Sequence, residues 1–213
     1  MEDPDGYALV YGNMVNPENA AGYVQHVSGS EAVEFSEDPG RITLHGEPLQ
    51  PITLSGYRRS FSHVARDELI ADSDLVDAES FEEFMEDEPY EDTENRGFLT
   101  IEEDAGSELN AVLVPMTEED LDFYETAEMG YHLEEVGEGV DAETDLPVHA
   151  AVSHTTGNPE PNRSYFRDCL NSWEKWGETT EVDQAQRFLE TTQVGGETLY
   201  EWASERQLIQ DNL

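Results

Sequence analysis

Two short segments hold the residues whose types and spacing could do chemistry, one at 11–15 and one at 118–131. The first follows the apolar run 7–10 and predicts a strand that ends in a tight turn containing a glycine. Such a turn presents backbone N–H groups in one direction, and these groups bind carboxylates or developing oxyanions. We therefore regard the turn as a candidate site for an anionic group. Its residues are Tyr11, Gly12, Asn13, Met14 and Val15.

The second segment predicts a short helix that ends beside a carboxylate. A hydroxyl residue followed by three acids is typical of a helix N-terminus, and the helix would bury Leu121 and Tyr124. Glu125 follows at the predicted helix end, where desolvation by apolar neighbours would raise its pKa. A carboxyl group that titrates near neutral pH can act as a general base and then as a general acid. Spacing alone does not favour Glu125 over Glu128.

The remaining reactive residue types show no pattern of a metal, cofactor or nucleophile site. Cys169 is the only cysteine, which excludes an intrachain disulfide, and its helical context predicts a packed thiol. His149 and His154 would lie on opposite faces of a strand, so they are not expected to share a metal. The chain contains no glycine-rich phosphate loop and no G-x-S-x-G string. We expect neither a metal nor a cofactor.

The composition predicts a folded, acidic protein from a salt-loving organism. The chain has 213 residues, with 50 acidic against 10 basic residues and a formal charge of −40. Such self-repulsion fits either a disordered acidic chain or a folded protein screened by molar salt. Nine Tyr, eight Phe and three Trp favour the folded alternative, because disordered acidic chains are poor in aromatic residues.

We expect this protein to need salt in order to fold. At molar ionic strength the Debye length falls to about 3 Å, which screens most of the repulsion among the carboxylates. Dialysis into salt-free buffer should therefore abolish the native circular dichroism spectrum. An unchanged spectrum would contradict this expectation.

The same charge balance restricts the partners. Nucleic acids and anionic membrane surfaces are bound through Lys and Arg, which are scarce here, so neither is an expected partner. No apolar run approaches the roughly 20 residues needed to span a bilayer. The acidic N-terminus lacks a signal-peptide pattern, and a cytoplasmic location is expected.

Periodicity predicts an α+β fold in one domain spanning 1–213, with an acidic surface insertion at about 66–94. The strand count favours a small, closed or nearly closed β-barrel of mixed or antiparallel strands, flanked by helices, with a helical C-terminal third. Strands are predicted at about 7–11, 33–35, 42–44, 51–61, 97–101, 109–115, 131–136 and 146–152. Helices are predicted at about 117–125, 162–177, 182–193 and 196–207.

In order and chemistry, the segments resemble the γ-glutamylcyclotransferase-like family, of which this chain would be an acidic, haloarchaeal-type member. The turn matches the family's opening Tyr-Gly turn, a later strand reads GYRRSF, and the helix carries the pattern LD-x-x-E. The likeness covers most of residues 7–190 apart from the acidic insertion. The matching positions are Tyr11 to Pro17, Gly56 to Phe61, Leu121, Asp122, Glu125, Tyr131, Pro161 and Tyr165.

The resemblance implies an enzyme that cyclises a γ-glutamyl amide to 5-oxoproline and releases an amine or amino acid. It makes Glu125 the general acid/base, and the turn 11–15 the source of N–H donors to the substrate. Tyr11 and Tyr131 would line the pocket, and no metal or nucleotide would take part. The partner would be a small γ-glutamyl compound.

Two alternatives remain open at this level. One is a non-catalytic relative that binds a small ligand or a protein partner; it is favoured by Asn13, where the family has Ser, and by a strand at 146–152 that lacks the usual Tyr. The other is a related γ-glutamylamine or amidotransfer-type reaction in the same pocket. The intact LD-x-x-E and GYRRSF segments favour the enzyme.

Overall fold

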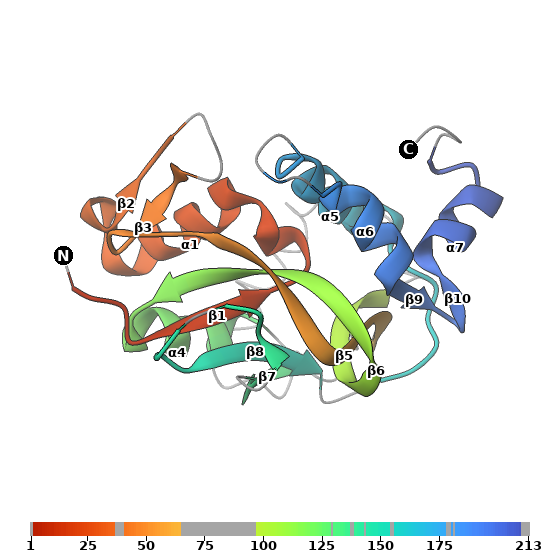
Figure 1. Cartoon of the computed structure of the whole chain (residues 1–213), viewed down its shortest axis with the longest axis horizontal. Helices are drawn as coiled ribbons and strands as arrows, with labels where there is room; N and C mark the ends of the chain where they lie inside the picture. The colour runs from red at the N-terminus through yellow and green to blue at the C-terminus, as the bar shows by residue number, and fades with distance from the viewer. Residues whose placement is uncertain are drawn as a thin grey trace, which may run out of the picture.

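The computed structural model describes residues 2–36, 41–64, 97–128, 130–136, 139–142, 144–153, 156–177, 180 and 182–209. Its strands lie mostly in the first part of the chain, and the last third is mainly helical (Figure 1). The predicted insertion at 66–94 lies outside the described residues, as does His154. The elements are β1 (Gly6–Val10), η1 (Asn13–Val15), α1 (Pro17–Ser28), η2 (Ser30–Ala32), β2 (Val33–Glu34), β3 (Thr43–Leu44), β4 (Glu47–Pro48), β5 (Gln50–Val64), β6 (Gly97–Met116), α4 (Glu118–Ala127), β7 (Tyr131–Glu135), β8 (Val148–Ser153), α5 (Arg163–Glu174), α6 (Gln184–Thr191), β9 (Thr192–Val194), β10 (Glu197–Thr198) and α7 (Leu199–Glu205).

A seven-stranded mixed sheet forms the centre of the fold, in the order β10-β9-β5-β6-β1-β8-β7. β1 pairs antiparallel with β6 and parallel with β8, so that Leu9 lies between Leu113 and Ala150. All five residues of β1 are buried, as expected for a continuous apolar run with neighbours on both sides. The carboxyl end of β1, where the turn 11–15 begins, therefore lies in the interior of the fold.

The sheet is open, and the prediction of a closed β-barrel is corrected accordingly. Strand pairing among the described residues ends at β10 on one side and at β7 on the other. The main reason is the length of β5 and β6, which have 15 and 20 residues and pair antiparallel. β6 joins the two strands predicted at 97–101 and 109–115, so fewer separate strands are available to close a barrel. β5 is irregular at Gly56, since its register with β6 shifts between Ser55 and Tyr57.

Helices α5, α6 and α7 gather beside one end of the sheet, away from the small β2-β3-β4 sheet (Figure 1). Each helix buries an apolar face; α5 buries Phe166 and Trp173, and α6 buries Phe188. The indole of Trp176, just beyond α5, donates to the carbonyl oxygen of Val15 at 2.7 Å. The C-terminal helices thus fix the position of the N-terminal turn. No described helix is long and apolar enough to cross a membrane.

A buried carboxylate connects α4 to the rest of the protein. Asp120 is fully buried, and its Oδ2 accepts hydrogen bonds from the N–H and hydroxyl of Thr117, which complete a capping box. The same oxygen lies 2.7 Å from His45 Nε2, and Oδ1 accepts from the hydroxyl of Ser28 at 2.8 Å. Asp120 therefore holds the start of α4 against α1 and the β3–β4 turn.

Replacing Asp120 with Ala is expected to lower the free energy of unfolding by about 3 kcal/mol or more, because several buried donors would lose their acceptor. Glu119→Ala is the matched control, since Glu119 lies in the same helical turn but is exposed. Its effect should stay within about 0.5 kcal/mol. Denaturant melts in matched KCl measure both, and equal effects would contradict the assignment.

Candidate functional site

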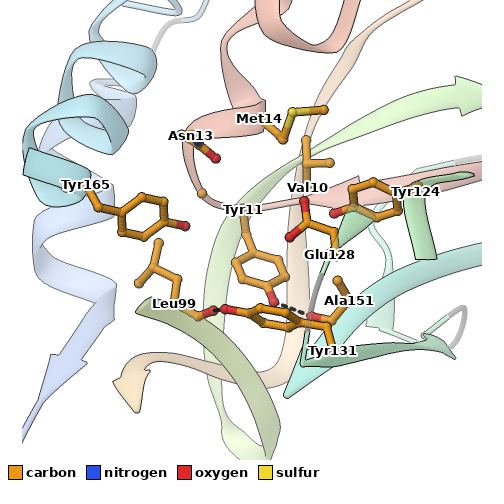
Figure 2. A pocket seen from close by; sticks show the side chains of 11 residues that line it. Val10, Tyr11, Asn13, Met14, Leu99, Tyr124, Glu128, Tyr131, Ala151 and Tyr165 are labelled. Atoms are coloured by element: carbon orange, nitrogen blue, oxygen red, sulfur yellow. Dashed lines mark hydrogen bonds between the residues drawn. The ribbon is translucent and has the colours of Figure 1, made fainter. Parts of the chain in front are cut away.

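A pocket lies at the carboxyl end of β1, between the turn, the end of α4 and helix α5 (Figure 2). It draws its residues from five separate parts of the chain, which the sheet and α5 bring together. Four of the predicted site residues in the turn line it, as does Tyr131 of β7. The lining residues are Val10, Tyr11, Gly12, Asn13, Met14, Leu99, Tyr124, Glu128, Tyr131, Ala151 and Tyr165.

Glu128 is the one acidic residue among these lining residues. It is the C-cap of α4, and its N–H donates to the carbonyl of Tyr124 at 3.0 Å, which ends the helix. Figure 2 shows its carboxylate directed between Val10 and Tyr124, above the ring of Tyr11. The side chain keeps some solvent-accessible surface, but burial among these neighbours raises its pKa from 4.5 to about 7. At neutral pH this group can both accept and donate a proton.

Glu125 is not in the pocket, and its predicted position is corrected. It is exposed on α4 and is absent from the pocket lining. The helix was expected to end near Glu125 but continues to Ala127. The carboxylate at the helix end is therefore Glu128, three residues later in the sequence.

Tyrosines make up much of the pocket wall. Tyr131 donates its hydroxyl to the carbonyl oxygen of Leu99 at 2.6 Å, and Tyr11 donates to the carbonyl oxygen of Ala151. Burial is the main cause that raises the pKa of both phenols, and the nearby Glu128 carboxylate raises each further. These tyrosines therefore stay neutral at physiological pH. Their fixed hydroxyls leave Glu128 as the titrating group among the lining residues.

Tyr165 faces Glu128 across the pocket from helix α5 (Figure 2). Its ring packs against Phe98 and Phe61, with centroids 5.0 and 6.2 Å away. Its hydroxyl would lie only 2.5 Å from a Cβ atom placed on Gly12. The glycine of the turn thus provides the room in which the Tyr165 hydroxyl sits.

We expect Gly12→Ala to displace Tyr165 from the pocket and to lower stability by about 1 to 3 kcal/mol through overpacking. Gly22→Ala is the matched control, because a Cβ at this exposed position of α1 meets nothing within 4 Å. That control should stabilise the helix by up to about 1 kcal/mol. Thermal melts distinguish the two, and a Gly12→Ala variant as stable as wild type would contradict the close contact.

The turn itself is held by donors that bind its carbonyl groups. Arg59 Nη1 donates to the Tyr11 carbonyl at 3.2 Å, and Asn19 Nδ2 donates to the Asn13 carbonyl at 3.1 Å. Val15 differs from its prediction as a site residue: it is fully buried in the core and does not line the pocket. Its carbonyl accepts the indole N–H of Trp176, so it anchors the turn from behind.

The pocket is narrow. Its cavity volume is about 30 Å³, which exceeds the roughly 10–15 Å³ that a single water molecule needs. A γ-glutamyl group is larger, and we expect lining side chains to move when one binds. Met14 is suited to such movement, since its side chain is unbranched and only partly buried.

Comparisons with known proteins find distant similarity to solved structures. No protein-family model and no curated protein matches the chain. A solved structure described as a gamma-glutamyl cyclotransferase is 12% identical, with a TM-score of 0.48, over 96% of this chain and 99% of that one. A human structure, uncharacterized protein loc79017, is 13% identical, with a TM-score of 0.49, over 95% and 98%. YkqA from Bacillus subtilis is 15% identical, with a TM-score of 0.44, over 81% and 49%. At such identities no residue role follows from the likeness.

Sequence reasoning missed three side chains of this site, each for a local reason. The sequence does not distinguish Glu128 from Glu125, and only the position of the helix end separates them. Tyr124 was expected to be buried, but its place beside Glu128 depends on how α4 packs. Tyr165 matched the family pattern without an assigned role, and only the docking of α5 brings it to the turn.

Proposed function

We propose that this protein cyclises a γ-glutamyl amide to 5-oxoproline and releases the amine, with Glu128 as the group that transfers protons. The support is the combination of the family-like segments with the pocket, in which the Tyr-Gly turn and a carboxylate share one lining. The observation that carries the proposal is the position of Glu128, whose pKa is raised to about 7 beside that turn.

The reaction needs no nucleophile from the protein. The substrate's α-amine attacks its own γ-carbonyl carbon, so one C–N bond forms while the other breaks. Glu128 takes a proton from the attacking amine and returns one to the leaving nitrogen, so that it ends in its starting state. The five-membered lactam is 5-oxoproline, and the leaving group departs as a neutral amine. Holding amine and carbonyl in contact supplies part of the rate enhancement through orientation.

The oxyanion of the tetrahedral intermediate would be stabilised by backbone donors of the turn. The first residues of a 3-10 helix have no intrahelical acceptor for their N–H groups, and η1 begins at Asn13. These donors are held by the scaffold before substrate arrives, which avoids reorganisation during the reaction. The neutral phenols of Tyr11 and Tyr131 would shape the apolar wall around the substrate.

The narrow cavity favours a second candidate function. A volume of about 30 Å³ is small for a γ-glutamyl group, so a relative that binds a smaller ligand without catalysis is the alternative. The two differ in a simple observable. An enzyme forms 5-oxoproline, whereas a binding protein changes only the spectra of its pocket residues.

The test is 5-oxoproline release from a panel of γ-glutamyl amines and γ-glutamyl amino acids in multimolar KCl. Chromatography with a 5-oxoproline standard measures the product, and the near-ultraviolet circular dichroism spectrum establishes that the protein is folded. The proposal expects at least one member of the panel to be turned over. A folded protein that releases no 5-oxoproline from any of them would leave the binding function instead.

A further inference from the structure

Arg59 lies one layer behind the pocket and is fully buried. Its Nη1 donates to the carbonyl groups of Tyr11 and Asn110 at 3.2 and 2.9 Å. Its other donors bind the Asn110 side chain at 2.8 Å and the hydroxyls of Thr192 and Thr191 at 2.7 and 3.2 Å. All five N–H groups of the guanidinium are thereby used, and every acceptor is neutral.

Burying a charged group in this environment costs free energy. The guanidinium lies over the ring of Phe188, with its Cζ 4.6 Å from the centroid, and 5.8 Å from that of Trp173. Among the described residues no carboxylate forms an ion pair with Arg59. A buried cation held only by dipoles and aromatic rings leaves an uncompensated positive potential around it. This potential extends to the turn, whose first carbonyl it binds.

Peptide geometry relates that potential to the pocket. The described residues contain no cis peptide bond, so the N–H of Gly12 points opposite to the carbonyl of Tyr11. Since that carbonyl points at Arg59, the Gly12 N–H points away from Arg59. A hydrogen bond to a cation also polarises a peptide group, which makes its N–H a stronger donor. Tyr11 and Gly12 line the pocket, whereas Arg59 does not.

We propose that Arg59 is a positioning residue that makes the turn an anion site, through the Tyr11–Gly12 peptide and the buried positive charge behind it. The inference rests on the proposed function in its choice of anion: the α-carboxylate of a γ-glutamyl substrate, which is retained in 5-oxoproline. Arg59 never touches this anion. It fixes the orientation of the donor and supplies the potential that favours a carboxylate over a neutral group.

Binding of 5-oxoproline, compared with its neutral amide 5-oxoprolinamide, tests the proposal. Titrations in matched KCl follow the Gly12 amide by nuclear magnetic resonance. Wild type should bind the acid at least about tenfold more tightly than the amide, as expected for one charge-assisted hydrogen bond. Arg59→Gln should reduce this preference to about twofold or less, whereas Arg59→Lys, which keeps the charge, should retain most of it. Arg58→Gln is the matched control, because the Arg58 side chain is 42% exposed and pairs with Glu102.

Several outcomes would overturn the inference. One is an Arg59→Gln protein with a native near-ultraviolet spectrum and an unchanged preference for the acid. If Arg59→Gln does not fold, wild type still decides: no preference for the acid, or a Gly12 amide that moves equally with both ligands, would overturn it. Turnover separates this inference from the proposed function. If wild type forms no 5-oxoproline but its preference for the acid still depends on Arg59, only the proposed reaction is contradicted. If wild type forms 5-oxoproline but its preference does not depend on Arg59, only the role of Arg59 is contradicted.

Discussion

Replacing Glu128 with Gln is expected to lower kcat for 5-oxoproline formation by about 10²–10⁴-fold, the usual contribution of a general acid–base group. The amide has nearly the same shape as the carboxyl group, but it can neither accept the amine proton nor return it to the leaving nitrogen. The Michaelis constant should change much less, because Glu128 is not proposed to hold the substrate carboxylate. Product release measured at saturating substrate and pH 7 tests this expectation.

Glu125→Gln is the matched control for that experiment. Glu125 lies one helical turn earlier on α4 and is exposed, so removing its charge should leave kcat within about twofold. The family-like pattern LD-x-x-E assigns the catalytic role to Glu125, whereas the pocket places Glu128 beside the turn. An inactive Glu125→Gln protein together with an active Glu128→Gln protein would reverse the proposed assignment.

Glu128→Gln should also stabilise the protein at alkaline pH. The pKa of Glu128 is raised from 4.5 to about 7, so the folded state binds a proton that the unfolded state has already lost at intermediate pH. Stability from this group is therefore fully present below about pH 4.5 and is lost as the pH rises to about 7. The loss amounts to about 3 kcal/mol above pH 7, and the neutral amide avoids it.

Denaturant melts of wild type and Glu128→Gln at pH 5 and pH 8 in matched KCl measure this effect. The two proteins should differ little at pH 5, and the variant should be more stable by up to about 3 kcal/mol at pH 8. The result does not depend on any substrate. A difference that is the same at both pH values would show that Glu128 titrates normally.

The sequence predicted the elements with strong local signals. The apolar run at 7–10 forms the buried strand β1, and Thr117 is the expected hydroxyl cap at the start of α4. The C-terminal helices also formed, with Asn162 as the N-cap of α5. In each case the element is determined by neighbouring residues within one strand or one or two helical turns, so the local sequence is enough to predict it.

Features that depend on packing were not predictable in this way. The β9–β10 hairpin takes up the end of one predicted helix and the start of the next, and Thr192 and Gln193 of β9 pair with Arg59 and Ser60 of β5. The closed barrel was wrong because β6 runs through what looked like a break between two strands. Such long-range pairings leave little signal in a single sequence.

The candidate site shows the same division. The turn residues 11–14 and Tyr131 follow from the sequence and line the pocket. The position of the carboxylate depends on where α4 ends. The helix ends two residues later than predicted, at Ala127, so the carboxylate that follows it is Glu128 and not Glu125. The idea of a desolvated carboxyl group at a helix end leads to the end of α4, and the observed helix boundary places Glu128 there.

Titration of the glutamate side-chain carboxyl groups by carbon-13 nuclear magnetic resonance tests the central claim most directly. The account expects one carboxyl resonance to titrate with a pKa of about 7, to be absent from Glu128→Gln and to remain in Glu125→Gln. If every glutamate instead titrates in the ordinary range, near a pKa of about 4.3, the pocket holds no desolvated proton-transfer group. In that case Glu128 could not act as proposed.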